Sequence, residues 1–121
     1  MIEDHVVLCG ANAYEQKYYF NPDFSKLPQT IQDELHIICV LFTEDAGGVF
    51  TISFADDGEV LLETEAAEED ILYDEINSRM LIGELQKKRR ELWQSLQLFY
   101  KMFILHEQID VDALTETEEE E

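Results

Sequence analysis

Residues 49–65 have the sequence VFTISFADDGEVLLETE, which predicts an antiparallel β-hairpin that turns within residues 56–58. A two-residue loop would mix the apolar and charged side chains of the two strands on both faces. A three-residue loop instead gathers the apolar side chains on one face, with Phe54 opposite Val60, Ile52 opposite Leu62 and Phe50 opposite Thr64. This register is therefore the expected one, and it predicts a type I turn with Gly58 in the left-handed region.

Two strands and a helix are predicted before the hairpin. Residues 5–9 and 17–20 are apolar or aromatic runs bounded by loop residues, as is typical of strands. Between residues 28 and 45 apolar residues recur at helical spacing; Pro28 suits the first turn, and the glycines at 47–48 can end the helix. The alternative to this helix is a buried strand over residues 36–42, which are nearly all apolar.

Helical structure is also predicted after the hairpin, from about residue 68. Acidic side chains in its first turn suit the positive end of the helix dipole. Ile71, Leu72 and Ile76 would then lie on one apolar side of the helix. Weak helix formers predict a break somewhere in residues 77–83.

A long helix is predicted for about residues 84–106. Its apolar seam repeats at steps of four and three residues, and Arg89 is the exception within it. A second apolar stripe lies off this seam and consists of Leu98, Met102 and Leu105. Since no other predicted element is left to cover this stripe in a monomer, we expect it to form a homodimer interface.

These elements together predict an α+β fold. A small antiparallel sheet, made of the 49–65 hairpin and the N-terminal strands, is expected to pack against the helix near 28–45 and the long C-terminal helix. Residues 1–108 are expected to form a single domain with enough apolar residues for a core. Residues 109–121 are expected to be a disordered acidic tail, because they are rich in Glu and hold few apolar side chains.

The charge balance is extreme, because 8 Lys and Arg against 28 Asp and Glu give a formal net charge of −20. Such a chain repels nucleic acids and anionic membranes, so we expect neither as a partner, whereas a basic protein would be attracted. Plain solubility is the competing explanation of the charge. The four basic residues 87–90 would fan around a helix and cannot form one patch.

The sequence also favours a cytoplasmic location. No stretch approaches the roughly 20 apolar residues of a membrane span, and the apolar run over residues 6–9 is too short for a signal peptide. Cys9 and Cys39 lie inside apolar runs, so we expect both to be reduced and buried.

Residues 56–75 hold ten acidic residues and no basic one. Three interpretations are open: a solvated face, a surface for a basic protein, or a cation site, since hard divalent cations take clustered oxygen ligands. The candidate interaction residues are Glu63, Glu65, Glu68, Glu69, Asp70 and Asp74. Convergence of the carboxylates between residues 63 and 70 on one point would favour a metal, and divergence would favour a protein-interaction surface.

Most catalytic signatures are absent from the chain, including a Gly-rich phosphate loop, paired-Cys zinc spacing, His-Glu-x-x-His and a nucleophile elbow. We therefore assign no catalytic residue, no metal ligand and no cofactor. The leading hypothesis is a non-enzymatic protein-interaction or regulatory module with an acidic surface, which could be homodimeric. The alternative is a small metal-dependent protein or enzyme that uses the acidic cluster 63–75.

Three further segments carry a resemblance to a known family: KYYFNPDFSKLP at 17–28, FTEDAGG at 42–48 and ILYDEI at 71–76. The chain resembles a family of short acidic bacterial proteins that is known only as a domain of unknown function. The resemblance covers most of residues 5–105. It implies a bacterial cytosolic origin, and it implies no activity and no functional residues.

Removal of the tail beyond residue 108 should leave the melting temperature nearly unchanged, because the tail cannot offset its own ordering entropy by burying apolar side chains. Thermal unfolding of the truncated chain, followed by circular dichroism, tests this. A fall of more than about 5 °C, the size of a loss of ~1 kcal/mol in a domain of this length, would contradict the prediction.

Overall fold

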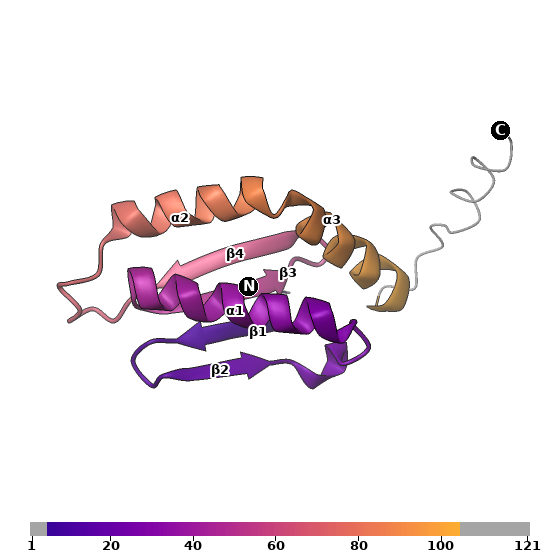
Figure 1. Cartoon of the computed structure of the whole chain (residues 1–121), viewed down its shortest axis with the longest axis horizontal. Helices are drawn as coiled ribbons and strands as arrows, with labels where there is room; N and C mark the ends of the chain where they lie inside the picture. Colours follow the sequence, from indigo (N-terminus) through magenta and orange to yellow (C-terminus); the bar gives the residue numbers. More distant parts are fainter. Residues whose placement is uncertain (1–4, 105–121) are drawn as a thin grey trace, which may run out of the picture.

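The computed structural model describes residues 5–104 and has the expected α+β fold (Figure 1). The elements in chain order are β1 (Val6–Asn12), β2 (Lys17–Phe20), a short 3₁₀ helix η1 (Pro22–Phe24), α1 (Gln29–Ala46), β3 (Val49–Phe54), β4 (Val60–Glu65), α2 (Glu75–Lys88), α3 (Arg90–Phe99) and a π-helical end η2 (Tyr100–Ile104). The strand over 17–20 has the predicted bounds, and α1 lies within a residue of the predicted helix.

The four strands form one antiparallel sheet in the order β2-β1-β3-β4. The hairpin has the predicted register, with Phe54 opposite Val60, Ile52 opposite Leu62 and Phe50 opposite Thr64. The backbone N–H of Gly58 donates to the carbonyl of Ala55 at 2.9 Å, and Gly58 has a φ of +94°. The predicted turn, with a glycine in a conformation that other residues avoid, is therefore confirmed.

β1 is longer than the strand predicted over residues 5–9, because it continues through Asn12. Gly10 lies opposite Tyr19 of β2 and Thr51 of β3, so this part of the strand is paired on both sides. The small residues that suggested a loop therefore belong to an inner strand, where pairing with two neighbours overrides their low strand propensity.

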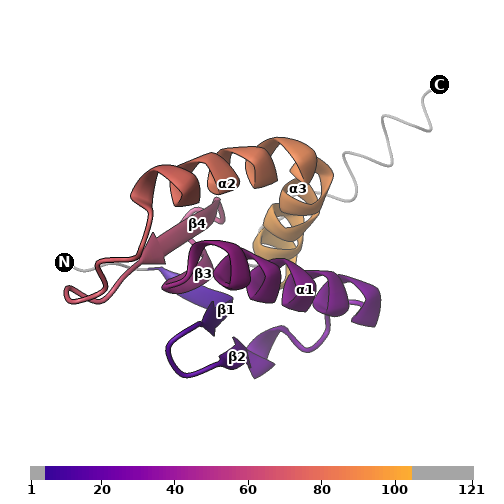
Figure 2. The same ribbon diagram turned by 60° about the vertical axis from the view of Figure 1, so that its left-hand side comes forward.

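The first helix packs across the sheet, mainly on β1 and β3 (Figure 2). The ring of Phe42 stacks on Phe50 with the centroids 4.2 Å apart, which confirms a helix rather than a strand over residues 36–42. The Sγ atoms of Cys9 and Cys39 are 3.8 Å apart, and both thiols are free and fully buried, as expected. Contact with Cys9, together with burial, raises the pKa of the Cys39 thiol above its usual range.

The C-terminal helical region differs from the prediction at both ends of α2. The helix begins at Glu75 rather than near residue 68, and it continues through residues 77–83, where a break was expected. The chain leaves the helical conformation at Arg89, with φ −115° and ψ 32°, and α3 then starts at Arg90. The single long helix over 84–106 was therefore wrong, and its last two residues lie outside the described part.

Local hydrogen bonds explain where α2 begins. The side chain of Asp74 accepts from the backbone N–H groups of Ile76 and Asn77, both at 3.0 Å, and this N-cap fixes the first turn. The side chain of Ser78 donates to the carbonyl of Glu75, and that of Asn77 donates to Asp45 of α1 at 3.1 Å. These contacts compensate for weak helix formers, so the predicted break does not occur.

Contacts across the helices explain where α2 ends. Arg89 turns toward α1, where its Nη1 lies 2.6 Å from Oε2 of Glu34. The indole N–H of Trp93 donates to the carbonyl of Leu85 at 2.9 Å, and this carbonyl also accepts from the backbone N–H of Arg89, so α3 is tied to the last turn of α2. Arg89, the one residue that breaks the predicted apolar seam, therefore marks a bend between α2 and α3, because its cation cannot occupy the core.

Beyond this bend, α3 packs against the hairpin. Leu92, Trp93 and Leu96 are buried, and the side chain of Gln97 accepts from the backbone N–H of Val60 at 3.0 Å. The ring of Tyr100 stacks on Phe54 with the centroids 4.4 Å apart. The bend thus lets the last helix cover the turn end of the hairpin.

Substitution of Gly48 by alanine should strongly destabilise the fold. Gly48 has a φ of +72°, and a Cβ there would lie 2.6 Å from the carbonyl oxygen of Glu65 and 2.8 Å from Cε1 of Tyr73. The left-handed conformation alone costs a residue with a side chain about 1–2 kcal/mol, and the clash adds to it. We expect urea unfolding to show a loss of at least ~2 kcal/mol.

Gly83→Ala is the matched control, because Gly83 lies inside α2 and a Cβ there meets no atom within 4 Å. It should stabilise the protein by about 0.5–1 kcal/mol through helix propensity. Equal effects of the two substitutions would contradict the close packing at Gly48.

Candidate interaction surface

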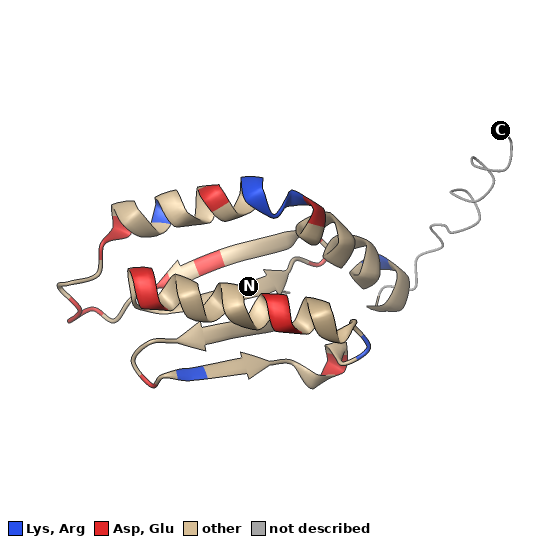
Figure 3. Ribbon diagram, viewed as in Figure 1, with Lys and Arg blue, Asp and Glu red and all other residues tan. Residues whose placement is uncertain are grey.

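The connection between β4 and α2, residues 66–74, carries the most exposed large apolar side chains of the described residues. Ile71 is 90% and Leu72 is 89% exposed, and acidic residues surround them in this segment (Figure 3). We call residues 66–74 the acidic loop. Exposure of two neighbouring apolar side chains is unfavourable in water. Contacts made by other residues of the loop must therefore hold the loop in this conformation.

Tyr14, from the turn between β1 and β2, holds the middle of the acidic loop. Its hydroxyl donates to Oδ2 of Asp70 at 2.6 Å and accepts from the backbone N–H of Ala67 at 3.0 Å. Oδ1 of Asp70 accepts from the backbone N–H of Leu72 at 3.1 Å. The hydrogen bond to Asp70 raises the pKa of Tyr14 above the usual value for a tyrosine. Tyr14 and Asp70 thus place Leu72 in a defined position.

Tyr73 holds the end of the loop. Its hydroxyl is hydrogen-bonded to the hydroxyl of Thr64 on β4, and its ring lies against Gly48, directly before β3. Asp74 follows directly and caps α2. The chain is therefore anchored both before Ile71 and after Leu72. A defined backbone conformation presents these two side chains.

A pocket of about 560 Å³ lies between the acidic loop and the first turns of α2. Four carboxylates line it, from Glu65, Glu68, Asp70 and Glu75, and Arg79 is the one basic residue among its lining. The exposed Ile71 is part of the same wall. The pocket therefore combines negative charge with an apolar edge, a chemistry that suits a basic side chain with an aliphatic stem.

The six predicted interaction residues do not all meet. Glu65, Glu68 and Asp70 share the pocket, whereas Glu63, Glu69 and Asp74 are not part of its lining. Glu63 lies 3.7 Å from Nδ1 of His5. Asp70 and Asp74 have structural roles as loop anchor and helix cap.

Within residues 5–104, no three His, Cys, Asp or Glu residues lie close enough together to hold a metal ion. The carboxylates between residues 63 and 70 do not converge on one point there.

Only two of the three residues of the predicted dimer stripe lie in the described part of the chain. Leu98 is 41% exposed on α3, Met102 is half-buried in η2, and Leu105 lies outside the described residues. The stripe stays a prediction.

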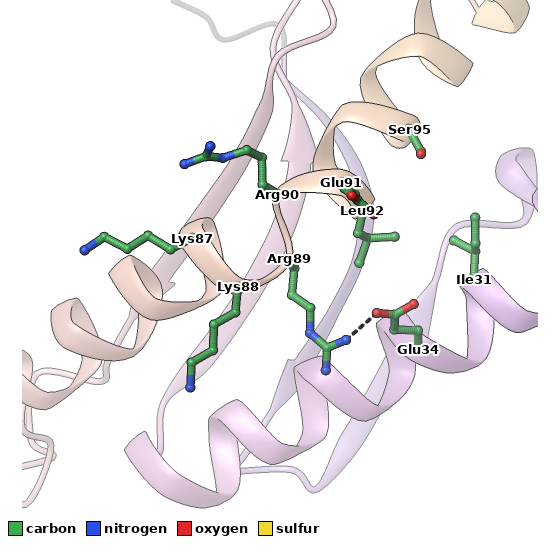
Figure 4. Close-up of a pocket in the computed structure, with 9 residues that line it drawn as sticks. All are labelled: Ile31, Glu34, Lys87, Lys88, Arg89, Arg90, Glu91, Leu92 and Ser95. Atoms are coloured by element: carbon green, nitrogen blue, oxygen red, sulfur yellow. Dashed lines mark hydrogen bonds and ion pairs between the residues drawn. The ribbon is translucent and has the colours of Figure 1, made fainter.

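The basic residues 87–90 diverge around the bend between α2 and α3 (Figure 4). They line an open pocket of about 750 Å³. Arg89 points to Glu34, while Lys87 and Arg90 extend away from that pair. The four side chains therefore diverge, as the sequence predicted. They do so at the end of α2 and the start of α3 rather than around one continuous helix.

Sequence reasoning missed the exposed apolar residues. Ile71, Leu72 and Ile76 were assigned to the apolar side of a helix, but the first two lie in the acidic loop and Ile76 is 72% exposed. The signal that could have revealed this is Asp74, a strong N-cap residue directly before the helical Glu75 and Ile76. It implies that the two preceding apolar residues lie outside the helix.

The described residues form an α+β fold whose acidic loop is anchored and exposes two apolar side chains, Ile71 and Leu72. The chain belongs to a family that is described as Family of unknown function (DUF6145), whose model matches residues 5–108. The resemblance to a family without assigned activity is thereby confirmed. No curated protein and no solved structure matches the chain.

Each helix of residues 5–104 is either too short or too polar to cross a bilayer.

Replacement of Tyr14 by phenylalanine should loosen the acidic loop, because it removes the hydroxyl that joins Asp70 and the backbone of Ala67. We expect the amide proton of Ala67 to exchange with solvent several-fold faster, while amides of β3 keep their protection. Hydrogen exchange measured by NMR reports both.

Tyr19→Phe provides the matched control, since the Tyr19 hydroxyl forms no hydrogen bond with any residue of the described part. It should leave exchange at Ala67 unchanged. Equal exchange in the two variants would show that Tyr14 does not anchor the loop.

Proposed function

We propose that this protein is a non-enzymatic protein-interaction module that binds a basic partner through the acidic loop and the adjoining first turns of α2. The observation that carries the proposal is the exposure of about 90% of Ile71 and Leu72 within an anchored loop. Large apolar side chains that a structure holds in water commonly mark a binding surface.

Burial of Ile71 and Leu72 in an interface would contribute a substantial binding free energy. Full burial of an Ile or Leu side chain contributes about 1.5–3 kcal/mol. Because Tyr14 and Tyr73 already fix the loop, binding requires little further ordering of the backbone, and more of this gain remains as affinity. Ile71 and Leu72 would thus act as the central anchors of the interface.

Charge supports a basic partner. The pocket beside Ile71 has four carboxylates and one arginine, and the whole chain has a formal charge of −20. Such a field accelerates the approach of a cationic surface and disfavours acidic competitors. The partner we propose therefore combines apolar side chains with neighbouring Lys or Arg residues.

The same proposal places the protein in a bacterial cytoplasm. The support for the compartment is that Cys9 and Cys39 lie side by side in the core as free thiols. Paired thiols without a disulfide suit a reducing compartment. The support for bacteria is the resemblance of the sequence.

A defined peptide tests the binding proposal. The probe is a fluorescent synthetic amphipathic peptide with leucines on one face and lysines on the other, titrated with the full chain at about 150 mM salt. We expect a chain that carries Ile71→Ser and Leu72→Ser to bind this peptide at least ~10-fold more weakly, although its net charge is unchanged.

Val7→Ser with Tyr19→Ser is the matched control, because these residues of β1 and β2 are also exposed and belong neither to the acidic loop nor to the first turns of α2. This variant should bind the peptide as the unmodified chain does. Unchanged binding by the loop variant, or equal binding of a peptide with glutamate in place of lysine, would show that the acidic loop is not the binding surface.

A further inference from the structure

A second exposed apolar surface lies on another part of the molecule, between α1 and α2. The two helices run antiparallel, since Asp45 near the end of α1 bonds Asn77 in the first turn of α2, and Glu34 of α1 pairs with Arg89 after the last turn. A groove of about 220 Å³ lies between these links, and its lining includes Ile37, Leu41 and Asp45 of α1 and Leu81, Leu85 and Lys88 of α2.

The lip of this groove is apolar and uncovered within the described residues. Ile37 is 56% and Leu41 is 57% exposed, and they stand one helical turn apart on α1. Leu81 and Leu85 of α2 are half-buried across from them. Side chains at i and i+4 form the ridge that packs into the groove of another helix pair.

Charge changes sign along the groove. Asp45 is exposed at one end, next to the acidic start of α2, and Lys88 is exposed at the other end, one helical turn after Glu84. Lys88 forms no ion pair with any described residue. The α1 segment between the two ends, residues 34–45, spans about 16 Å at 1.5 Å per residue.

We propose that a second copy of this chain docks on the α1–α2 groove in a twofold antiparallel arrangement. Ile37 and Leu41 of each chain pack against the groove of the other. The twofold axis brings Asp45 of one chain opposite Lys88 of the other, and does so twice. The two ends of the groove, at Asp45 and at Lys88, are therefore complementary in charge to each other.

This polarity separates a second copy from a basic protein as the occupant. A groove that binds a uniformly basic segment would be acidic along its length, whereas Lys88 would repel such a segment at one end here. The net charge of −20 per chain opposes pairing. At about 150 mM salt the screening length is near 8 Å, so distant repulsion is damped while the close Asp45–Lys88 pairs persist.

The mass in solution tests this proposal. The full chain at ~50 μM, a concentration ample for sub-micromolar affinity, should have twice the mass of one chain in light scattering at about 150 mM salt. Ile37→Asp should shift the mass to that of one chain, because the side chain is exposed and its replacement leaves the core intact. Leu98→Asp on α3 tests the competing stripe that the sequence predicts, and it should leave the dimer unchanged if the groove is the interface.

A charge-reversal cycle provides a second test that does not depend on the apolar residues. Asp45→Lys alone, which also removes the hydrogen bond from Asn77 within the chain, and Lys88→Asp alone each place like charges opposite one another and should weaken the dimer at least ~10-fold. Both substitutions in one chain restore opposite charges and should return the dimer to near its original affinity.

A single-chain mass for the unmodified protein would overturn the proposal. So would a dimer that survives Ile37→Asp or separates with Leu98→Asp, or a double charge variant that stays as weak as the single variants. The acidic loop is not part of this groove, so the Ile71→Ser and Leu72→Ser chain should remain a dimer, and failure of either proposal leaves the other open to its own test.

Discussion

The buried face of β3 is the constraint on which the rest of the structure depends. Phe50, Ile52 and Phe54 are fully buried along it, and three other segments each pack an aromatic ring there: Phe42 from α1, Phe24 from η1 and Tyr100 at the end of α3. Aromatic stacks of this kind combine a large buried area with a preferred geometry. Since alternation along the strand puts the three β3 side chains on one face, the register of the hairpin determines where the helices can pack.

The second helix belongs to a different layer of this arrangement. Ser78 is its only buried residue, and the helix packs mainly on α1 and α3 rather than on the sheet. Polar contacts link it to its surroundings at both ends, through Asn77 with Asp45 and through Arg89 with Glu34. A helix attached in this way leaves apolar surface on both sides, at the groove along α1 and at the acidic loop before its first turn. Both proposed interfaces therefore result from how little of α2 the core covers.

The sheet and α1 were predictable because their signals are periodic. Alternation of apolar residues gave the hairpin register, and helical spacing with a glycine stop gave α1. The second half was less predictable because its boundaries depend on distant partners: Arg89 leaves the helix toward Glu34, and Asn77 is held by Asp45. For the candidate surface, the sequence indicated only an excess of acidic residues. Its apolar anchors, Ile71 and Leu72, resemble core residues in the sequence, and only the contacts of Tyr14 and Tyr73 show that they face water.

The hydrogen bond between Tyr14 and Asp70 joins residues 56 positions apart in the chain. A contact of such high sequence separation closes late, since most of the intervening chain must first be organised to bring its ends together. During synthesis Tyr14 leaves the ribosome long before Asp70, and the acidic loop gains its Tyr14 anchor only when these distant segments have come together. The loop therefore takes its fixed shape only in the finished fold, and a partner that recognised this shape would distinguish mature protein from nascent or partly unfolded chains.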